Sequence, residues 1–175
     1  MPISDQRLNR ERYSVIPRVL IFVRRGTCLL LLKLSPRDGK VTRWTGRYNG
    51  LGGHIERGED VLTAARRELR EEAGIEAGLR LCGNLIVDTG EELGIELHIF
   101  CGEYVSGELA ATSEGTPEWI EVSALAQTPL VEDGPVLISR VLAMKPGDPP
   151  FLARSFYDEQ GKLQVKFTEQ KTSRS

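Results

Sequence analysis

The 175-residue chain lacks several features that mark membrane and nucleic-acid-binding proteins. Its longest apolar runs have the length of strands, too short to span a bilayer. It has 23 basic and 25 acidic residues, so it lacks the basic excess typical of duplex binding, and we expect no nucleic-acid duplex and no membrane among its partners. Residues 1–13 contain no apolar segment of the signal-peptide type, which favours a cytoplasmic location.

Cysteine is also scarce. Cys28, Cys82 and Cys101 lie within apolar runs, and their spacing fits no metal-binding pattern. An odd number of cysteines in such runs predicts buried free thiols in a reducing compartment. We therefore expect three unbonded cysteines.

Acidic residues, in contrast, are concentrated in one stretch, residues 53–75, which reads GHIERGEDVLTAARRELREEAGI. On a helix, the spacing of Glu68, Glu71 and Glu72 points the three carboxylates the same way. Their repulsion destabilises the helix unless positive charge lies among them. Crowded hard oxygen ligands favour a hard divalent cation, Mg²⁺ or Mn²⁺ in its place, and cations of this class handle phosphates.

The remaining pattern predicts one domain at residues 13–168, between a loose arm at 1–12 and a disordered tail at 169–175. Helical spacing predicts a helix that begins at Asp60 and is closed by Gly74, and a second helix over 131–144. Strands are expected at residues 15–23, 27–34, 79–87, 95–105, 119–120, 151–156 and 163–167. This order fits an α/β fold with a mixed sheet covered on both faces. The long segment 35–49 is expected to be a loop at the edge of a site.

The acidic stretch resembles the Nudix box. That pattern is a Gly, five residues, a Glu, seven residues, then Arg-Glu-apolar-any-Glu-Glu-any-Gly-apolar. Every fixed position is met, by Gly53, Glu59, Arg67, Glu68, Leu69, Glu71, Glu72, Gly74 and Ile75. The resemblance implies the Nudix fold, an α/β/α sandwich with the box as a loop-helix-loop. The alternative is a solvated helix held by i to i+4 charge pairs.

The resemblance also implies roles for these residues. Glu68 and Glu72 match the positions that hold the metal, and Glu71 matches a further ligand or the group that orients the attacking water. The backbone carbonyl of Gly52 completes the coordination. Glu59 and Arg67 match a pair that braces the loop against the helix, together with the fixed glycines 53 and 74.

A second resemblance, patchy from residue 14 to 167, is to the MutT-type oxidised-purine nucleoside triphosphatases. Residues 47–53, RYNGLGG, resemble the strand in which Asn49 reads a purine edge, although Asn-Gly turn chemistry explains this residue equally well. Glu114 matches a further metal ligand, with Glu118 as a weaker competitor. Glu132 and Asp133 match paired acids that contact the base, although an acid-rich helix start would look the same.

The chain departs from this second family at three positions. Leu130 replaces a Trp that stacks on the base, and His54 replaces a Lys that contacts phosphate. Arg18 replaces a small polar residue on the first strand, where it either lies at a strand edge or reaches the ligand. Arg18 and Lys33 are both candidates for substrate binding. His98 lies in an alternating strand and is expected to be structural.

These observations favour a Mg²⁺-dependent hydrolase that splits nucleoside triphosphates, in particular oxidised purines such as 8-oxo-dGTP, into a monophosphate and pyrophosphate. Another Nudix substrate is the alternative: ADP-ribose, a dinucleoside polyphosphate or a nucleotide sugar. A nucleotide-binding regulatory module would require a damaged box. Isopentenyl diphosphate isomerase shares the fold but needs a cysteine near its substrate. A monomer and a homodimer are both left open.

Overall fold

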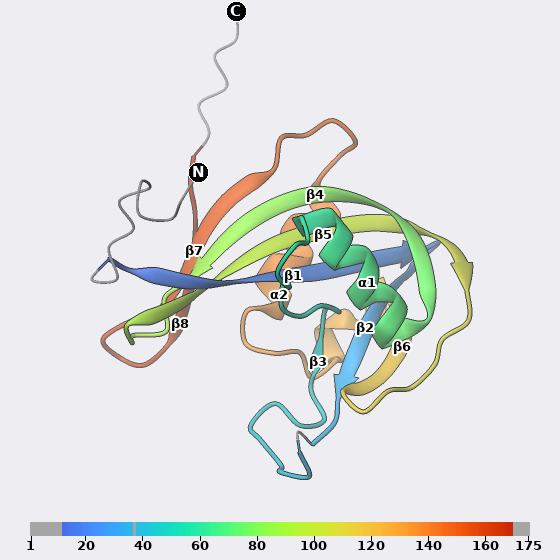
Figure 1. The fold of residues 1–175 in the computed structure, drawn as a ribbon, viewed down its shortest axis with the longest axis horizontal. Helices are drawn as coiled ribbons and strands as arrows, with labels where there is room; N and C mark the ends of the chain where they lie inside the picture. Colours follow the sequence, from blue (N-terminus) through green and yellow to red (C-terminus); the bar gives the residue numbers. More distant parts are fainter. Residues whose placement is uncertain (1–11, 37, 170–175) are drawn as a thin grey trace, which may run out of the picture.

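Eight strands and two α-helices make up the described part of the chain, residues 12–36 and 38–169, in this computed structural model (Figure 1). The arm expected at 1–12 and the tail at 169–175 lie outside the described residues, apart from Arg12 and Glu169. The elements are β1 (Ser14–Arg25), β2 (Cys28–Leu34), β3 (Tyr48–Asn49), α1 (Val61–Ala73), β4 (Ile75–Val87), β5 (Leu93–Gly107), β6 (Gly115–Glu121), a 3-10 helix (Val122–Gln127), α2 (Gly134–Ala143), β7 (Phe151–Tyr157) and β8 (Leu163–Phe167). No helix in these ranges is long and apolar enough to cross a bilayer.

All eight strands belong to one mixed sheet. Its order is β3-β2-β1-β5-β4-β7-β8, and β6 pairs with β2. β1 runs parallel to β5 and β4 runs parallel to β7, whereas the other pairs are antiparallel. The expected mixed sheet and both expected hairpins, β1–β2 and β7–β8, are therefore confirmed.

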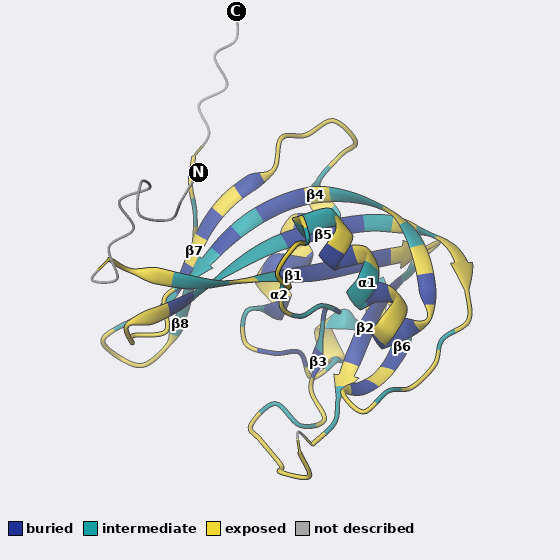
Figure 2. Ribbon diagram, in the orientation of Figure 1, coloured by how far each residue is buried: buried dark blue, intermediate teal, exposed yellow. Residues whose placement is uncertain are grey.

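The sheet has a separate apolar core on each face. Successive side chains of β1 point to opposite faces of the sheet. Val19 and Ile21 therefore lie in the core under α1, and Leu20 and Phe22 lie in the core under α2. Figure 2 shows the buried middle of the strands between the two helices. The molecule is thus the expected α/β/α sandwich.

Helix α1 has the expected boundaries. The carboxylate of Asp60 accepts hydrogen bonds from the backbone N–H groups of Leu62 and Thr63, at 2.8 and 3.0 Å. At the other end Gly74 adopts φ 69°, and its N–H donates to the carbonyl of Arg70. The buried face of the helix includes Ala64, Ala65, Leu69 and Ala73, so the same helix packs on the core and presents acids to the edge of the sheet.

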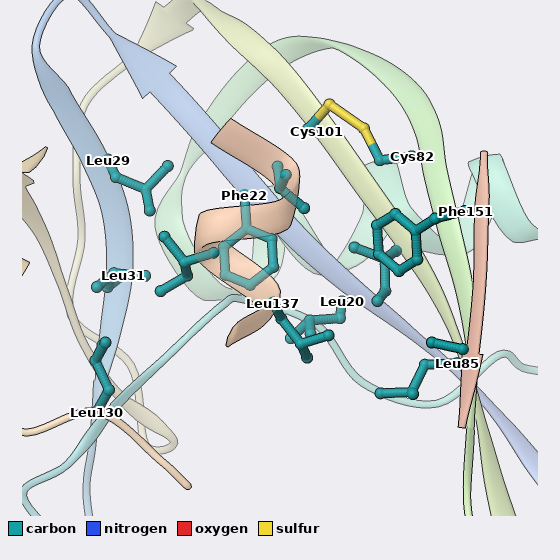
Figure 3. Close-up of a cluster of buried hydrophobic side chains, with 14 of the residues drawn as sticks. Leu20, Phe22, Leu29, Leu31, Cys82, Leu85, Cys101, Leu130, Leu137 and Phe151 are labelled. Carbon is teal, nitrogen blue, oxygen red and sulfur yellow. A yellow bond between two sulfur atoms is a disulfide. The ribbon is translucent and has the colours of Figure 1, made fainter. Parts of the chain in front are cut away.

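The prediction of three free thiols is wrong for two of them. Cys82 and Cys101 form a disulfide, which lies in the core under α2 (Figure 3), and Cys28 remains free. The two cysteines face each other because β4 and β5 are antiparallel neighbours and the register shifts between Leu81 and Gly83. The argument from free thiols for a reducing compartment therefore no longer applies.

Candidate active site

Arg67 on α1 is the positive charge that the acidic helix requires. Its Nε donates to Glu59 at 2.8 Å, and its Nη1 donates to Glu68 at 2.9 Å and to Glu71 at 3.0 Å. Its Nη2 donates to Glu59 and to the backbone carbonyl of His54. These carboxylates raise the pKa of Arg67 further, so it stays charged. One guanidinium thus joins three carboxylates and ties the loop to the helix.

Glu72 is the buried acid of the site. It is 4% exposed and accepts a hydrogen bond from the backbone N–H of Gly52 at 2.6 Å. Burial is the largest cause that raises its pKa to about 8, and the neighbouring carboxylates of Glu68 and Glu114 contribute to this rise, against the hydrogen bond from Gly52. Burial also raises the pKa of Glu68, against the effect of Arg67. The metal-free site therefore holds a protonated Glu72 at neutral pH.

Two glycines let the loop approach the helix closely. Gly52 has φ 137°, and a Cβ there would overlap the carbonyl oxygen of Val19 on β1. A Cβ on Gly53 would lie 2.5 Å from a carboxylate oxygen of Glu68. The Gly53 carbonyl accepts a hydrogen bond from Val19 at 2.9 Å, which fixes the loop along β1. Gly52 is therefore required both by space and by backbone conformation, whereas a side chain on Gly53 would displace the Glu68 carboxylate.

Of the two acids near β6, only Glu114 lies beside the buried acid. Its charge contributes to the raised pKa of Glu72, and its backbone carbonyl accepts a hydrogen bond from Ser35 at 3.0 Å. Glu118 instead accepts a hydrogen bond from the hydroxyl of Tyr48 at 2.8 Å. The structure thus brings together Glu68, Glu72 and Glu114 and leaves Glu118 with Tyr48.

The donor set fits a divalent cation. Three carboxylates influence one another, one of them is buried and protonated, and a cation of charge two would allow all of them to ionise. Within the described residues, no three acidic, histidine or cysteine side chains converge closely enough to enclose a cation as they stand. Arg67 holds Glu68, and the Gly52 N–H holds Glu72, so binding would involve an exchange of these partners.

The candidate base-binding residues lie at the start of α2 and on β3. The side-chain oxygen of Asn49 accepts a hydrogen bond from Gly50 at 2.8 Å, a local contact of the turn. The Lys33 ammonium lies 5.8 Å from the ring centre of Tyr48, its partner on β3, whereas Asn49 pairs with Leu32. Arg47 donates to the carbonyl of Leu130 at 2.9 Å and joins β3 to the segment before α2.

The two acids before α2 have different surroundings. Glu132 accepts a hydrogen bond from the Tyr157 hydroxyl at 2.6 Å, and Arg43 donates to the same hydroxyl at 3.2 Å. Burial raises the pKa of Asp133, and among the described residues its side chain makes no capping bond to α2. Sequence reasoning missed Arg43 and Tyr157, which are 114 residues apart and carry no local signal.

Arg18 and His54 are brought together, whereas His98 lies elsewhere. Arg18 on β1 pairs with His54 through an isolated β-bridge, and it follows the alternation that points to the α2 side. His98 has the opposite orientation and is half-buried beside Asn84 (3.5 Å) and Glu96 (3.9 Å). The surroundings of His98 are those of a structural residue, as its alternating strand predicts.

The α/β/α sandwich and its carboxylate-rich loop and helix define a Nudix-type protein. The family model described as "NUDIX domain" matches residues 15–141, which is most of the chain, and this chain belongs to that family.

Several known proteins are similar to it. The "oxidized purine nucleoside triphosphate hydrolase" of Danio rerio is 37% identical over 82 residues, which cover 46% of this chain and 53% of that protein. The "NAD-capped RNA hydrolase NudC" of Pseudomonas aeruginosa strain LESB58 is 34% identical over 116 residues, 65% of this chain and 38% of that protein. The chain thus spans about half or less of the length of these relatives. A MutT protein structure from Bacillus halodurans superimposes with a TM-score of 0.72 at 23% identity and covers 87% of this chain and 97% of that one.

Proposed function

We propose that this protein is a divalent-metal-dependent hydrolase that splits a phosphate–phosphate linkage in a purine nucleotide. The leading substrate is a nucleoside triphosphate, with a nucleoside monophosphate and pyrophosphate as products. The observation that carries the proposal is the buried Glu72 beside Glu68 and Glu114, next to Gly52, where the backbone of Val19 leaves no space for a side chain.

The surroundings of each of these residues suggest its role in the hydrolysis. A bound Mg²⁺ would supply charge neutralisation at the phosphates and would lower the pKa of a water molecule. Glu68, Glu72, Glu114 and the Gly52 carbonyl would hold it. Hydrolysis joins a water oxygen to phosphorus, leaves the bridging oxygen on the departing phosphate, and releases one proton. We assign to Glu71, whose side chain is 59% exposed and pairs with Arg67, the role of orienting that water or accepting the proton.

The proposed preference for purines depends on residues of β3 and of the segment before α2. Asn49, which pairs with Leu32 of β2, carries a side-chain amide that can donate and accept, and burial raises the pKa of Asp133. Oxidation of guanine at C8 turns N7 from an acceptor into a donor, which suits a carboxylate such as Glu132 or Asp133. With Leu130 in place of an aromatic wall, we expect modest discrimination for 8-oxo-dGTP.

A screen tests the proposal. Nucleoside triphosphates, 8-oxo-dGTP, ADP-ribose and dinucleoside polyphosphates are incubated with the protein and Mg²⁺, and the formation of nucleoside monophosphate is followed by chromatography. Metal-dependent turnover of at least one purine nucleotide is expected. Binding without turnover of any of them would support a regulatory module instead. The fold alone does not decide between the two.

A further inference from the structure

Tyr157, the last residue of β7, joins the loop after β2 to the segment before α2. Its hydroxyl donates to Glu132, just before α2, at 2.6 Å, and accepts from the guanidinium of Arg43, in the loop between β2 and β3, at 3.2 Å. Arginine can only donate, so the single proton of the hydroxyl is left for the carboxylate. We call Arg43, Tyr157 and Glu132 the strap. The proposed hydrolysis gives no role to Arg43 or Tyr157.

The strap connects parts of the fold that the sheet keeps apart. β1, β5 and β4 lie between β2 and β7 in the strand order, and Arg43 is 114 residues from Tyr157. A second bond joins the same loop to the segment before α2, because Arg47 donates to the carbonyl of Leu130 at 2.9 Å. The loop is therefore attached to this segment twice, directly at Leu130 and through Tyr157 at Glu132.

Arg43 is also held within its own loop. Its guanidinium lies 4.2 Å from the ring centre of Trp44, a cation–π contact. The turn that carries both residues is closed by side-chain hydroxyls. The N–H of Thr42 donates to Thr45 Oγ1 at 2.9 Å, and the N–H of Trp44 donates to Thr42 Oγ1 at 3.2 Å. The hydroxyl of Tyr157 thus meets a donor that is already in place, which lowers the entropic cost of the contact.

The two acids before α2 are held differently. Glu132 is exposed, and its Oε2 is occupied by the hydrogen bond from Tyr157. Asp133 is half-buried, and burial raises its pKa. The segment that carries both acids is tied to β3, since the N–H of Val131 donates to the carbonyl of Tyr48 at 3.0 Å. The strap therefore holds Glu132 at the surface and leaves Asp133 as the acid on the buried side of the segment.

We propose that Tyr157, backed by Arg43, is a positioning residue that holds Glu132 away from the purine, so that Asp133 alone contacts the base edge. A short hydrogen bond from a phenol to a carboxylate is among the stronger contacts in proteins, and an acid held in this way does not rotate freely toward a ligand. The proposal rests on the proposed function, because it assigns the residue that reads the base in the same nucleotide site.

The kinetics of single and double variants test this positioning role. Oxidation of guanine at C8 adds a donor, N7–H, so a second free carboxylate should favour the oxidised base. Tyr157→Phe should therefore raise the ratio of kcat/KM for 8-oxo-dGTP over dGTP by about 3- to 10-fold, a range between exposed and buried charged hydrogen bonds. Adding Glu132→Gln should reverse the rise, and Arg43→Met should give a smaller rise. Tyr13→Phe is the matched control, since its hydroxyl lies 3.4 Å from the carbonyl of Val87, outside the strap.

Three results of this experiment would overturn the proposal. The first is an unchanged or lower ratio in Tyr157→Phe, and the second is a rise that persists when Glu132→Gln is added. The third is a fall of the ratio in Glu132→Gln alone that equals the fall in Asp133→Asn, because Glu132 would then contact the base itself.

The strap can also be measured without turnover. The hydrogen bond to Glu132 is the largest cause that raises the pKa of Tyr157 above its ordinary value. In a pH titration of ¹³C-labelled tyrosine by NMR, with Tyr157→Phe to identify the signal, Glu132→Gln should lower this pKa. An ordinary pKa for Tyr157 in the wild type overturns the proposal. If the protein turns over no nucleotide, the proposed function fails, and the ratio of Kd for 8-oxo-dGTP and dGTP is compared in the same variants. Equal Kd ratios in the wild type and Tyr157→Phe then overturn the proposal as well.

Discussion

The raised pKa of Glu72 makes the stability of the metal-free protein depend on pH. In the unfolded chain this carboxyl has a pKa near 4.5, and in the fold burial raises it to about 8. Between these values the folded state binds the extra proton, so stability falls as pH rises through the window. At about 1.4 kcal/mol for each pKa unit, the difference between 8 and 4.5 corresponds to about 5 kcal/mol in the free energy of unfolding. The folded state loses this stabilisation as the pH rises to 8 and above.

Glu72→Gln removes the charge and keeps an oxygen that accepts from the Gly52 N–H. In metal-free buffer the variant should match the wild type near pH 4.5 and exceed it by several kcal/mol at pH 9, measured by urea unfolding at intervals of one pH unit. Glu71→Gln is the matched control, because that side chain is 59% exposed, and its effect should stay below about 1 kcal/mol at every pH. If the difference in unfolding free energy between Glu72→Gln and the wild type did not change with pH, Glu72 would not be a buried, protonated acid in the folded protein.

Three further predictions concern the loop and the base. Asn49→Ala should reduce kcat/KM for a purine triphosphate by about 10- to 200-fold and leave a short polyphosphate nearly unaffected, whereas equal losses on both would show that Asn49 serves only the turn. Asp133→Asn should lower the ratio of kcat/KM for 8-oxo-dGTP over dGTP, and a wild-type ratio near one would reject the oxidised-purine preference. Gly53→Ala should displace Glu68 and lower kcat by about tenfold or more, with a destabilisation of about 1–3 kcal/mol in thermal unfolding; unchanged kcat would show that the loop moves aside.

The sequence predicts the parts of the fold that depend on local chemistry. Asp60 and Gly74 set the ends of α1 because a cap and a left-handed glycine act on their immediate neighbours. β4, in contrast, begins at Ile75 and not at the expected residue 79, since pairing with β5 outweighs the weak strand pattern around Gly78. Helix α2 is shorter than expected and begins at Gly134, just before Pro135.

The parts of the core and of the site that were not predicted depend on pairing between strands or on residues far apart in the sequence. The bond between Cys82 and Cys101 requires a register shift that no periodicity indicates. The contacts of the Tyr157 hydroxyl with Glu132 and Arg43 arise only when the β7–β8 hairpin lies beside the start of α2 and the long loop. The box residues were recognisable because they act within one loop and one helix.

If the buried acid of α1 serves metal-dependent hydrolysis, Glu72→Gln should lose turnover. The wild type and the variant are assayed at pH 8 with Mg²⁺ on the best purine nucleotide from the screen, with Glu118→Gln as the control because Glu118 bonds to Tyr48 and not to the cluster. We expect Glu72→Gln to lose several orders of magnitude in kcat while it remains folded, and Glu118→Gln to stay within about tenfold of wild type. Near-normal turnover of Glu72→Gln in Mg²⁺ would show that Glu72 has no part in hydrolysis.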